Sequence, residues 1–466
     1  MSFPTIEFAT FFLVVFVLSW AFMPHPRAWR PFILVASYFF YGWVDWRWVL
    51  LLVASSVVNT FAAQVIARSP AQATRRRALT GAIVFDLGLL CVFKYLGFFV
   101  SELDGALESA GLGSPLPLVQ IVLPIGISFF TFQAISYVVD VYRGETRAAS
   151  LVEVAILQAF FPHLVAGPIV RANELLPQLR VPRDPRTVLA GPALLMIVAG
   201  IVKKTVVADE LARRIVDPVY NDPGAHSAGE LTLAFYGFAA QIYCDFSGYT
   251  DMAIGLALLL GYQLPQNFNR PYLALSLRDF WRRWHMTLSR WLRDYLYIPL
   301  GGSRRGRLRT YRNVMVTMLL GGLWHGAAWT FVIWGGIHGG ALSAERLGRE
   351  RFAGFRLPAW AAWLVTFHVV CIAWVFFRAP DLGTAFDVLG GLGLSGPSPL
   401  VTLPIVFLVV VAVAVQAVPA GWWREAEAWL VARPVAMQGL AVGATIVIAD
   451  AAVGQQGVAP FIYFQF

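Results

Sequence analysis

Apolar runs that approach or exceed the ~20 residues needed to cross the hydrocarbon core of a bilayer recur along this chain. A globular core does not require stretches of this length, whereas membrane-spanning helices do. Shorter apolar pieces bring the expected number of membrane helices to about eleven. We therefore predict an all-α polytopic membrane protein, with residues 1–466 forming a single membrane domain. The long runs cover residues 6–23, 49–66, 79–100, 119–141, 188–202, 231–260, 360–377, 401–418 and 437–453.

Charged residues are few and unevenly placed in this chain. They make up 14% of it, against ~25% in a typical soluble domain, and the net charge is +9. Basic residues concentrate between apolar runs, at 75–77, 171–186 and 278–312, as in the cytoplasmic loops of membrane proteins. We expect this charge to set the topology and to contact anionic lipid, and we expect no nucleic acid partner.

The same charge pattern predicts an N-terminus on the outer face. Residues 1–5 carry no Lys or Arg, whereas Arg27 and Arg30 follow the first span and Arg68 follows the third. The acidic segment 101–110 is then expected to be an external loop. The first run lacks a basic n-region and a small-residue cleavage site, so we expect it to remain as the first span.

Three apolar stretches contain residues that interrupt a helix. In 151–170, two prolines and His163 predict a re-entrant element that enters and leaves on the cytoplasmic side. The stretch 243–251 has the same broken character, and 314–342 is long enough for two half-helices interrupted at 321–326. Non-helical backbone at that depth is tolerated where protein buries it or where it lines a cavity.

His325 is the strongest candidate for a catalytic residue. It follows Trp324 near the middle of the run 314–342, where an ionisable side chain is costly and usually faces an interior cavity. Imidazole also has an unperturbed pKa suited to proton transfer near neutral pH. Gly322 and Gly326 would let a substrate approach the backbone closely. The alternative is a buried histidine that only forms hydrogen bonds. Such structural roles are expected for the other intramembrane histidines, His163, His338 and His368.

The segment 278–291 combines arginines with regularly spaced large apolar residues. As a single helix, it would place Phe280, Trp284, Leu288 and Trp291 at steps of three and four residues. That pattern is typical of a basic amphipathic helix at a membrane interface. Guanidinium groups also bind phosphates, so the arginines could hold the phosphates of a nucleotide-bearing acyl donor. The candidates for that role are Arg282, Arg283 and Arg290.

Asp245 and Asp251 are further ionisable residues within an apolar run. They are six positions apart, about 240° around a regular helix, so we do not expect them to share a face or a proton. Hydrogen bonding within a polar seam is the expected role, and a proton relay that includes His325 is the alternative. The sequence contains no HExxH, GxSxG or GxxxxGK[ST] pattern and no cluster of Cys and His, so we expect no metal site.

An ordered set of motifs resembles the membrane-bound O-acyltransferase family. The motifs are DFSGYT at 245–250, NFNRPY at 267–272, the segment 279–291 and LWHGA at 323–327. The likeness covers nearly the whole chain, because SYFFYGW at 37–43 and FIYFQF at 461–466 belong to the same pattern. It points to the bacterial alginate O-acetylation branch, with the D-alanine transfer proteins of teichoic acid more distant.

This resemblance implies a ring of tilted helices around a central funnel or tunnel. It implies that His325 is essential and that His285 is the second histidine of the family motif. We further expect Trp324, Asp245 and Asp251 to line the substrate tunnel, although packing of the tryptophan is an equal alternative.

The implied task is to take an acyl group in the cytoplasm, expected to be acetyl from acetyl-CoA, and to deliver it outside. There a partner acyltransferase would place it on a polysaccharide hydroxyl. The protein is therefore expected in the bacterial plasma membrane, with acyl-CoA as a substrate and no permanently bound cofactor. His325 would act as a general base or as a transient acyl carrier. The alternatives are a proton-coupled transporter or flippase, and a non-catalytic scaffold of a polysaccharide assembly complex.

Overall fold

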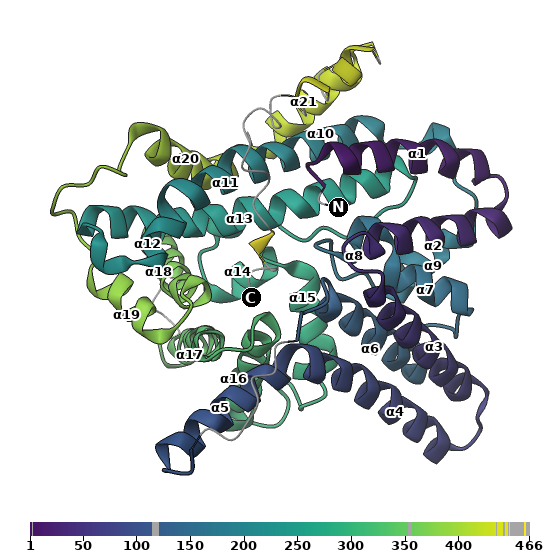
Figure 1. Cartoon of the computed structure of the whole chain (residues 1–466), viewed down its shortest axis with the longest axis horizontal. Helices are drawn as coiled ribbons and strands as arrows, with labels where there is room; N and C mark the ends of the chain where they lie inside the picture. The colour runs from purple at the N-terminus through teal and green to yellow at the C-terminus, as the bar shows by residue number, and fades with distance from the viewer. Residues whose placement is uncertain are drawn as a thin grey trace. The chain divides into compact units, whose positions relative to one another are not determined.

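The computed structural model describes residues 1, 3–113, 121–352, 357–434, 436–440, 443–445, 447 and 461–462. Within these residues the secondary structure is helical, without strands (Figure 1), as predicted. The predicted span at 437–453 and the motif at 461–466 lie largely outside the described residues. Residue contacts divide the chain into two compact units. The assignment of 1–466 to a single domain stays a prediction.

The first unit consists of Met1, Thr10–Val188 and Leu260–Pro265. Its helices are α2 (Pro26–Gly42), α3 (Arg47–Arg68), α4 (Gln72–Leu90), α5 (Leu96–Ser109), α6 (Ile127–Arg143), α7 (Leu151–Ala159), α8 (Phe161–Leu164), α9 (Ala172–Leu179) and most of α1 (Ile6–Phe22). Helix α3 packs against α4, α6 and α7, around a core that includes Leu52 and Phe130. The segment 101–110 is not a loop as predicted, because α5 continues to Ser109, while its position on the external side stays a prediction.

The second unit consists of Ser2–Ala9, Leu189–Leu259 and Gln266–Phe466. Its helices are α10 (Ala190–Ile201), α11 (Asp209–Leu211), α12 (Asp217–Asn221), α13 (Ala228–Leu259), α14 (Leu277–Arg283), α15 (Met286–Trp291), α16 (Arg307–His325), α17 (Trp329–Arg351), α18 (Ala359–Arg378), α19 (Leu382–Gly390), α20 (Leu403–Ala414) and α21 (Ala420–Val431). The π-helical turns Val202–Ala208 and Ala212–Val216 join α10, α11 and α12 into one long bulged helix that packs along α13. Both catalytic candidates belong to this second unit.

Within the described part of the chain, the helices long and apolar enough to cross a bilayer number four. A fifth is added if the bent pair Leu403–Ala417 and Gly421–Val431 counts as one span. The protein is therefore a multi-pass membrane protein, while the predicted total of about eleven helices stays a prediction. The 32-residue α13 is not one of the four, because polar residues such as Gln241 lower its hydropathy. The four spans are Arg47–Arg68, Gln72–Ser109, Ala190–Asn221 and Ala359–Arg378.

Of the three stretches predicted to be broken, 151–170 is broken as expected. Helix α7 ends at Ala159, and the His163 imidazole forms a hydrogen bond of 3.0 Å with the Leu157 carbonyl near that end. This confirms the predicted role of His163 in satisfying backbone groups. The predicted break at 243–251 is wrong, because α13 runs through it without interruption. Gly248 instead permits close contact with α10, since a Cβ there would lie 2.8 Å from the Gly200 carbonyl oxygen.

The stretch 314–342 forms a hairpin of two full helices, α16 and α17, packed against each other along their length (Figure 1). The predicted interruption at 321–326 is misplaced, because α16 continues through the glycine pair and ends only at His325. The glycines bring the two backbones together: a Cβ at Gly322 would collide with the Phe331 carbonyl oxygen. A Cβ at Gly326 would collide with the Phe331 ring, so this space holds protein and not substrate.

Candidate functional site

His325 is the last residue of α16, at the turn of the hairpin. Its side chain is buried among aromatic rings, with centroid distances of 5.0 Å to Trp324, 4.9 Å to Trp334 and 5.1 Å to Phe377. These rings come from both arms of the hairpin and from α18. The burial predicted for an interior catalytic histidine is therefore present, and the surrounding rings exclude water from the imidazole.

His285 lies between two short helices and has a left-handed backbone conformation, with φ 41° and ψ 55°. The prediction of one amphipathic helix over 278–291 is therefore wrong, since α14 ends at Arg283 and α15 starts at Met286. The aromatic residues of this segment face protein and not lipid. Trp284 is 1% exposed and packs 4.9 Å from Trp374.

Asn267 forms hydrogen bonds with the residues at the break between α14 and α15, where His285 lies. Its side-chain oxygen accepts hydrogen bonds from the Thr287 backbone N–H at 3.2 Å and the Thr287 hydroxyl at 2.8 Å. The same oxygen lies 3.1 Å from Nδ1 of His285. Burial lowers the pKa of His285 to about 3, so the imidazole is neutral at physiological pH. Sequence reasoning missed Asn267 as a site residue, although it opens one of the motifs.

The two histidines share one tryptophan neighbour. The Trp324 ring lies 6.1 Å from the His285 ring and 5.0 Å from the His325 ring. On the other side of His325, Trp334 contacts both His325 and His338, the latter at 4.7 Å. The structure thus brings together His325, His285 and Trp324. His338 packs within the same aromatic cluster, which agrees with the structural role expected for it.

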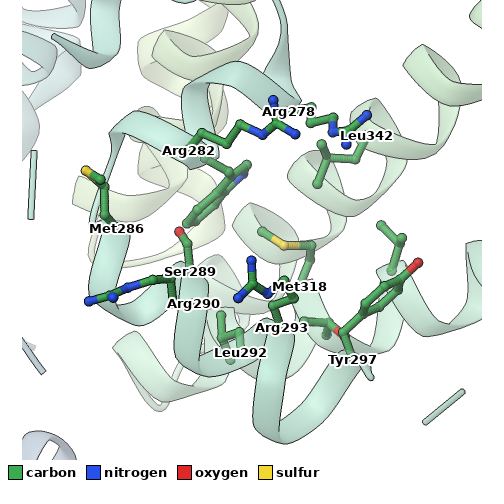
Figure 2. Close-up of a pocket in the computed structure, with 13 residues that line it drawn as sticks. Arg278, Arg282, Met286, Ser289, Arg290, Leu292, Arg293, Tyr297, Met318 and Leu342 are labelled. Atoms are coloured by element: carbon green, nitrogen blue, oxygen red, sulfur yellow. The ribbon is translucent and has the colours of Figure 1, made fainter. Parts of the chain in front are cut away.

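A pocket of about 450 Å³ lies beside this cluster and is lined by four arginines (Figure 2). The predicted phosphate ligands Arg282 and Arg290 line it, and Arg278 and Arg293, which sequence reasoning missed, line it as well. Figure 2 shows Arg278 and Arg282 along one edge of the pocket and Arg293 beside Met318. The remaining lining residues are Trp281, Met286, Ser289, Leu292, Tyr297, Val314, Thr317, Met318 and Leu342.

Arg283, the third arginine predicted to hold phosphate, is not one of the residues lining the pocket. Its side chain forms an ion pair of 2.9 Å with Asp279, one turn earlier on α14. The side chains of this pair are about one-third exposed. Arg283 follows Arg282 on α14 and is rotated by about 100° around the helix from it, so the two side chains leave the helix in different directions.

The pocket wall is connected to both histidines through neighbouring residues. Met286, adjacent to His285 in the chain, lines the pocket, and so does Met318, which lies seven residues or ~10 Å along α16 from His325. Trp281 also lines it, donates a hydrogen bond from Nε1 to Nδ1 of His338 at 3.3 Å, and contacts Trp334. The pocket wall therefore adjoins His285 through Met286, and it is linked to His325 through Trp281 and Trp334.

Asp245 and Asp251 form ion pairs with two consecutive lysines. Lys204 lies 2.6 Å from Asp245 and 2.8 Å from Asp209, and all three side chains are buried. Lys203 lies 2.6 Å from Asp251 in a pair that is about one-quarter exposed. The polar seam expected for the two aspartates is therefore present. Sequence reasoning missed the lysines, although two cations at the end of an apolar run were a usable signal.

Comparisons with known proteins place the chain in a family. A model described as the membrane-bound O-acyltransferase family matches residues 148–379, which contain both histidines and all four pocket arginines. The chain is 43% identical over 394 residues to the probable alginate O-acetylase AlgI of Pseudomonas aeruginosa, covering 83% of this chain and 74% of that protein. It is 38% identical over 419 residues to the peptidoglycan O-acetyltransferase of Helicobacter pylori, covering 83% and 78%.

A more distant similarity extends to teichoic acid D-alanyltransferases. The protein of Streptococcus thermophilus is 28% identical over 229 residues, which cover 46% of this chain and 55% of that protein. The predicted resemblance is therefore confirmed, both to the alginate O-acetylation branch and, more distantly, to the D-alanine transfer proteins of teichoic acid. The chain belongs to the membrane-bound O-acyltransferase family and is an O-acyltransferase.

Proposed function

We propose that this protein transfers an acetyl group from acetyl-CoA in the cytoplasm towards a hydroxyl of an extracytoplasmic polysaccharide, with His325 at the reaction centre. The polysaccharide acceptor rests on the relatives, which are named for O-acetylation of alginate and of peptidoglycan. The observation that carries the proposal is the arginine-lined pocket, whose wall adjoins His285 through Met286 and is linked to His325 through Trp281 and Trp334. A pocket of about 450 Å³ lies within the ~300–1,000 Å³ range of small-molecule sites.

The pocket suits a nucleotide-bearing thioester. The planar guanidinium group binds phosphate through paired N–H donors, and four arginines around one cavity supply several such donors. The apolar residues Met286, Leu292 and Met318 would contact the uncharged arm of the donor. With the phosphates held by the arginines, the thioester end would extend towards His325.

Two versions of the chemistry fit this arrangement. In the first, His325 removes the proton of the acceptor hydroxyl while its oxygen attacks the thioester carbonyl carbon. The C–S bond then breaks, and the CoA thiolate leaves and takes that proton. In the second, the imidazole attacks the carbonyl carbon, the C–S bond breaks, and CoA leaves as the thiol with the imidazole proton. The hydroxyl oxygen then attacks the acyl carbon, the C–N bond breaks, and the hydroxyl proton returns to the imidazole. A partner acyltransferase on the outer face would complete delivery to the polysaccharide.

Purified protein incubated with radiolabelled acetyl-CoA tests this proposal. Thioester turnover or transfer of label to an acceptor is the expected result. Solute movement driven by a proton gradient, without thioester turnover, would indicate a transporter or flippase instead. The absence of both activities would indicate a scaffold of a polysaccharide assembly complex.

Replacing Arg282 or Arg290 by alanine should raise KM for acetyl-CoA more than it lowers kcat, because the lost contact is with the bound donor. A hydrogen bond to a charged group is worth ~1.5–3 kcal/mol, which corresponds to roughly a tenfold or larger rise in KM. Steady-state kinetics on the purified variants measures this. Arg283→Ala is the matched control, because Arg283 pairs with Asp279 and does not line the pocket, and it should leave KM unchanged. An unchanged KM in the two pocket variants, with normal expression, would contradict the proposed donor site.

The proposed direction of transfer requires a plasma membrane protein with its N-terminus outside. Single cysteines introduced within 71–78 and 301–309 should react with impermeant reagents only from the cytoplasm, and those within 104–109 only from outside. The physical reason is the concentration of basic residues in the first two segments. Labelling of both basic segments from the external face would reverse the orientation.

A further inference from the structure

Asn267 lies at the centre of the break between α14 and α15. Its side chain is fully buried, and its amide oxygen accepts from both the backbone N–H and the hydroxyl of Thr287. Its backbone carbonyl accepts a further hydrogen bond of 2.9 Å from the Met286 N–H. A backbone N–H is only a donor, so the amide atom that faces it must be the oxygen. The orientation of the Asn267 amide is thereby fixed.

This fixed orientation determines where the proton of His285 lies. The Asn267 oxygen only accepts, and it is 3.1 Å from Nδ1 of His285, so Nδ1 must be the protonated nitrogen. A neutral imidazole with its proton on Nδ1 carries a lone pair on Nε2. His285 can therefore accept a hydrogen bond or a proton at Nε2, but it cannot donate one from that atom.

The backbone at His285 supports a positioning role for its neighbour. A residue other than glycine at φ 41° persists only where the surrounding contacts hold it there. Asn267 makes contacts with three consecutive residues of this turn, His285, Met286 and Thr287. The groups that face the imidazole from α13 and α16 are the Phe246 and Trp324 rings, and His325 packs against the same Trp324.

We propose, resting on the transferase function above, that Asn267 is the positioning residue of His285. It holds the imidazole in the Nδ1–H tautomer, so that Nε2 serves the reaction as an acceptor. Nε2 of His285 then accepts a hydrogen bond that orients a bound substrate, and it cannot donate one to the thioester carbonyl oxygen.

The tautomer is measured by solid-state ¹⁵N NMR of histidine-labelled protein in lipid bilayers, with the His285 signals assigned by difference from His285→Ala. The expected spectrum at neutral pH shows a protonated Nδ1 and an unprotonated Nε2 on His285. Protonation on Nε2 would overturn the proposal. This measurement does not depend on turnover. Inactivity of the wild-type protein towards acetyl-CoA would therefore overturn the proposed function, while the NMR spectrum alone decides the tautomer of His285.

The pH dependence of acetyl transfer supplies the second test. Asn267→Asp keeps the acceptor for Thr287 and His285 but places a negative charge beside the imidazole, which should raise the pKa of His285 by roughly 1–3 units. His285 then becomes protonated as the pH falls through this raised pKa and loses its acceptor, so the acid limb of the pH profile moves up by the same amount. Asn267→Ala should lower kcat by roughly 10–100-fold, by analogy with the loss seen when a residue that orients a metal-bound histidine is removed.

Asn269→Ala is the control, because Asn269 is an exposed asparagine two residues further along the same segment. It should leave the tautomer, kcat and the pH profile unchanged. A purely structural Asn267 would lower stability and activity at every pH without moving the acid limb. Superimposable pH profiles of the wild type and Asn267→Asp would therefore overturn the proposal.

Discussion

Replacement of His325 by glutamine is expected to lower acyl transfer by roughly 10²–10⁴-fold, the range that positioned proton transfer supplies. Glutamine keeps most of the side-chain volume between the rings of Trp324, Trp334 and Phe377, so the protein should remain folded. The measurements are radiolabelled acetyl transfer and thermal unfolding of the same purified preparation. His325→Ala should show the same loss of transfer with a larger loss of packing.

The ratio of the two losses separates a catalytic His325 from a structural one. A buried residue that only forms hydrogen bonds would leave a stranded partner at a cost of ~1–3 kcal/mol, and stability would fall together with activity. His368→Gln is the control, because His368 bonds to the Tyr236 hydroxyl and the Leu364 carbonyl outside the site. His285→Ala should give a partial defect. A stable His325→Gln or His325→Ala protein that transferred acetyl at near wild-type rate would refute the central role of His325.

Replacement of Lys204 by methionine is expected to lower the free energy of unfolding by roughly 3–5 kcal/mol, because it leaves buried carboxylates without their cation. Lys204 is 1% exposed and lies within 3 Å of both Asp245 and Asp209. Methionine fills much of the space of the lysine stem, so the loss of stability reflects mainly the removal of the positive charge. The measurement is the midpoint of SDS-induced unfolding of the purified protein.

Lys203→Met is the matched comparison, because the adjacent lysine pairs with Asp251 at the same distance of 2.6 Å but remains 26% exposed. A pair of this kind typically contributes only ~0–1 kcal/mol, so its loss should be several-fold smaller. Equal destabilisation by the two substitutions would show that burial does not set the strength of these ion pairs.

The long apolar runs of the sequence were sufficient to predict the helical class and the multi-pass character, and the prolines within 151–170 were sufficient to predict the break there. It also identified His325, because an ionisable residue inside a long apolar run is costly wherever the chain folds. Arg282 and Arg290 were predicted from side-chain chemistry alone, and the structure places both at one pocket, while their binding of phosphate stays a prediction.

What the sequence did not reveal depends on contacts between distant residues. The break at His285 requires Asn267, eighteen positions earlier, to hold a left-handed residue inside what otherwise has the periodicity of a helix. Nothing local predicts that conformation in a histidine. The continuity of α13 likewise depends on Lys203 and Lys204 on another helix, which neutralise the aspartates that suggested a break.

The glycine-mediated contact between α16 and α17 has a consequence for how a group can cross this protein. His325 lies at the turn between two antiparallel helices whose backbones are in close contact at Gly322 and Gly335. This contact restricts movement of the turn relative to the helices. A stationary imidazole cannot carry cargo from one face of the bilayer to the other. Under the proposed function, donor and acceptor must therefore travel to it from opposite entrances.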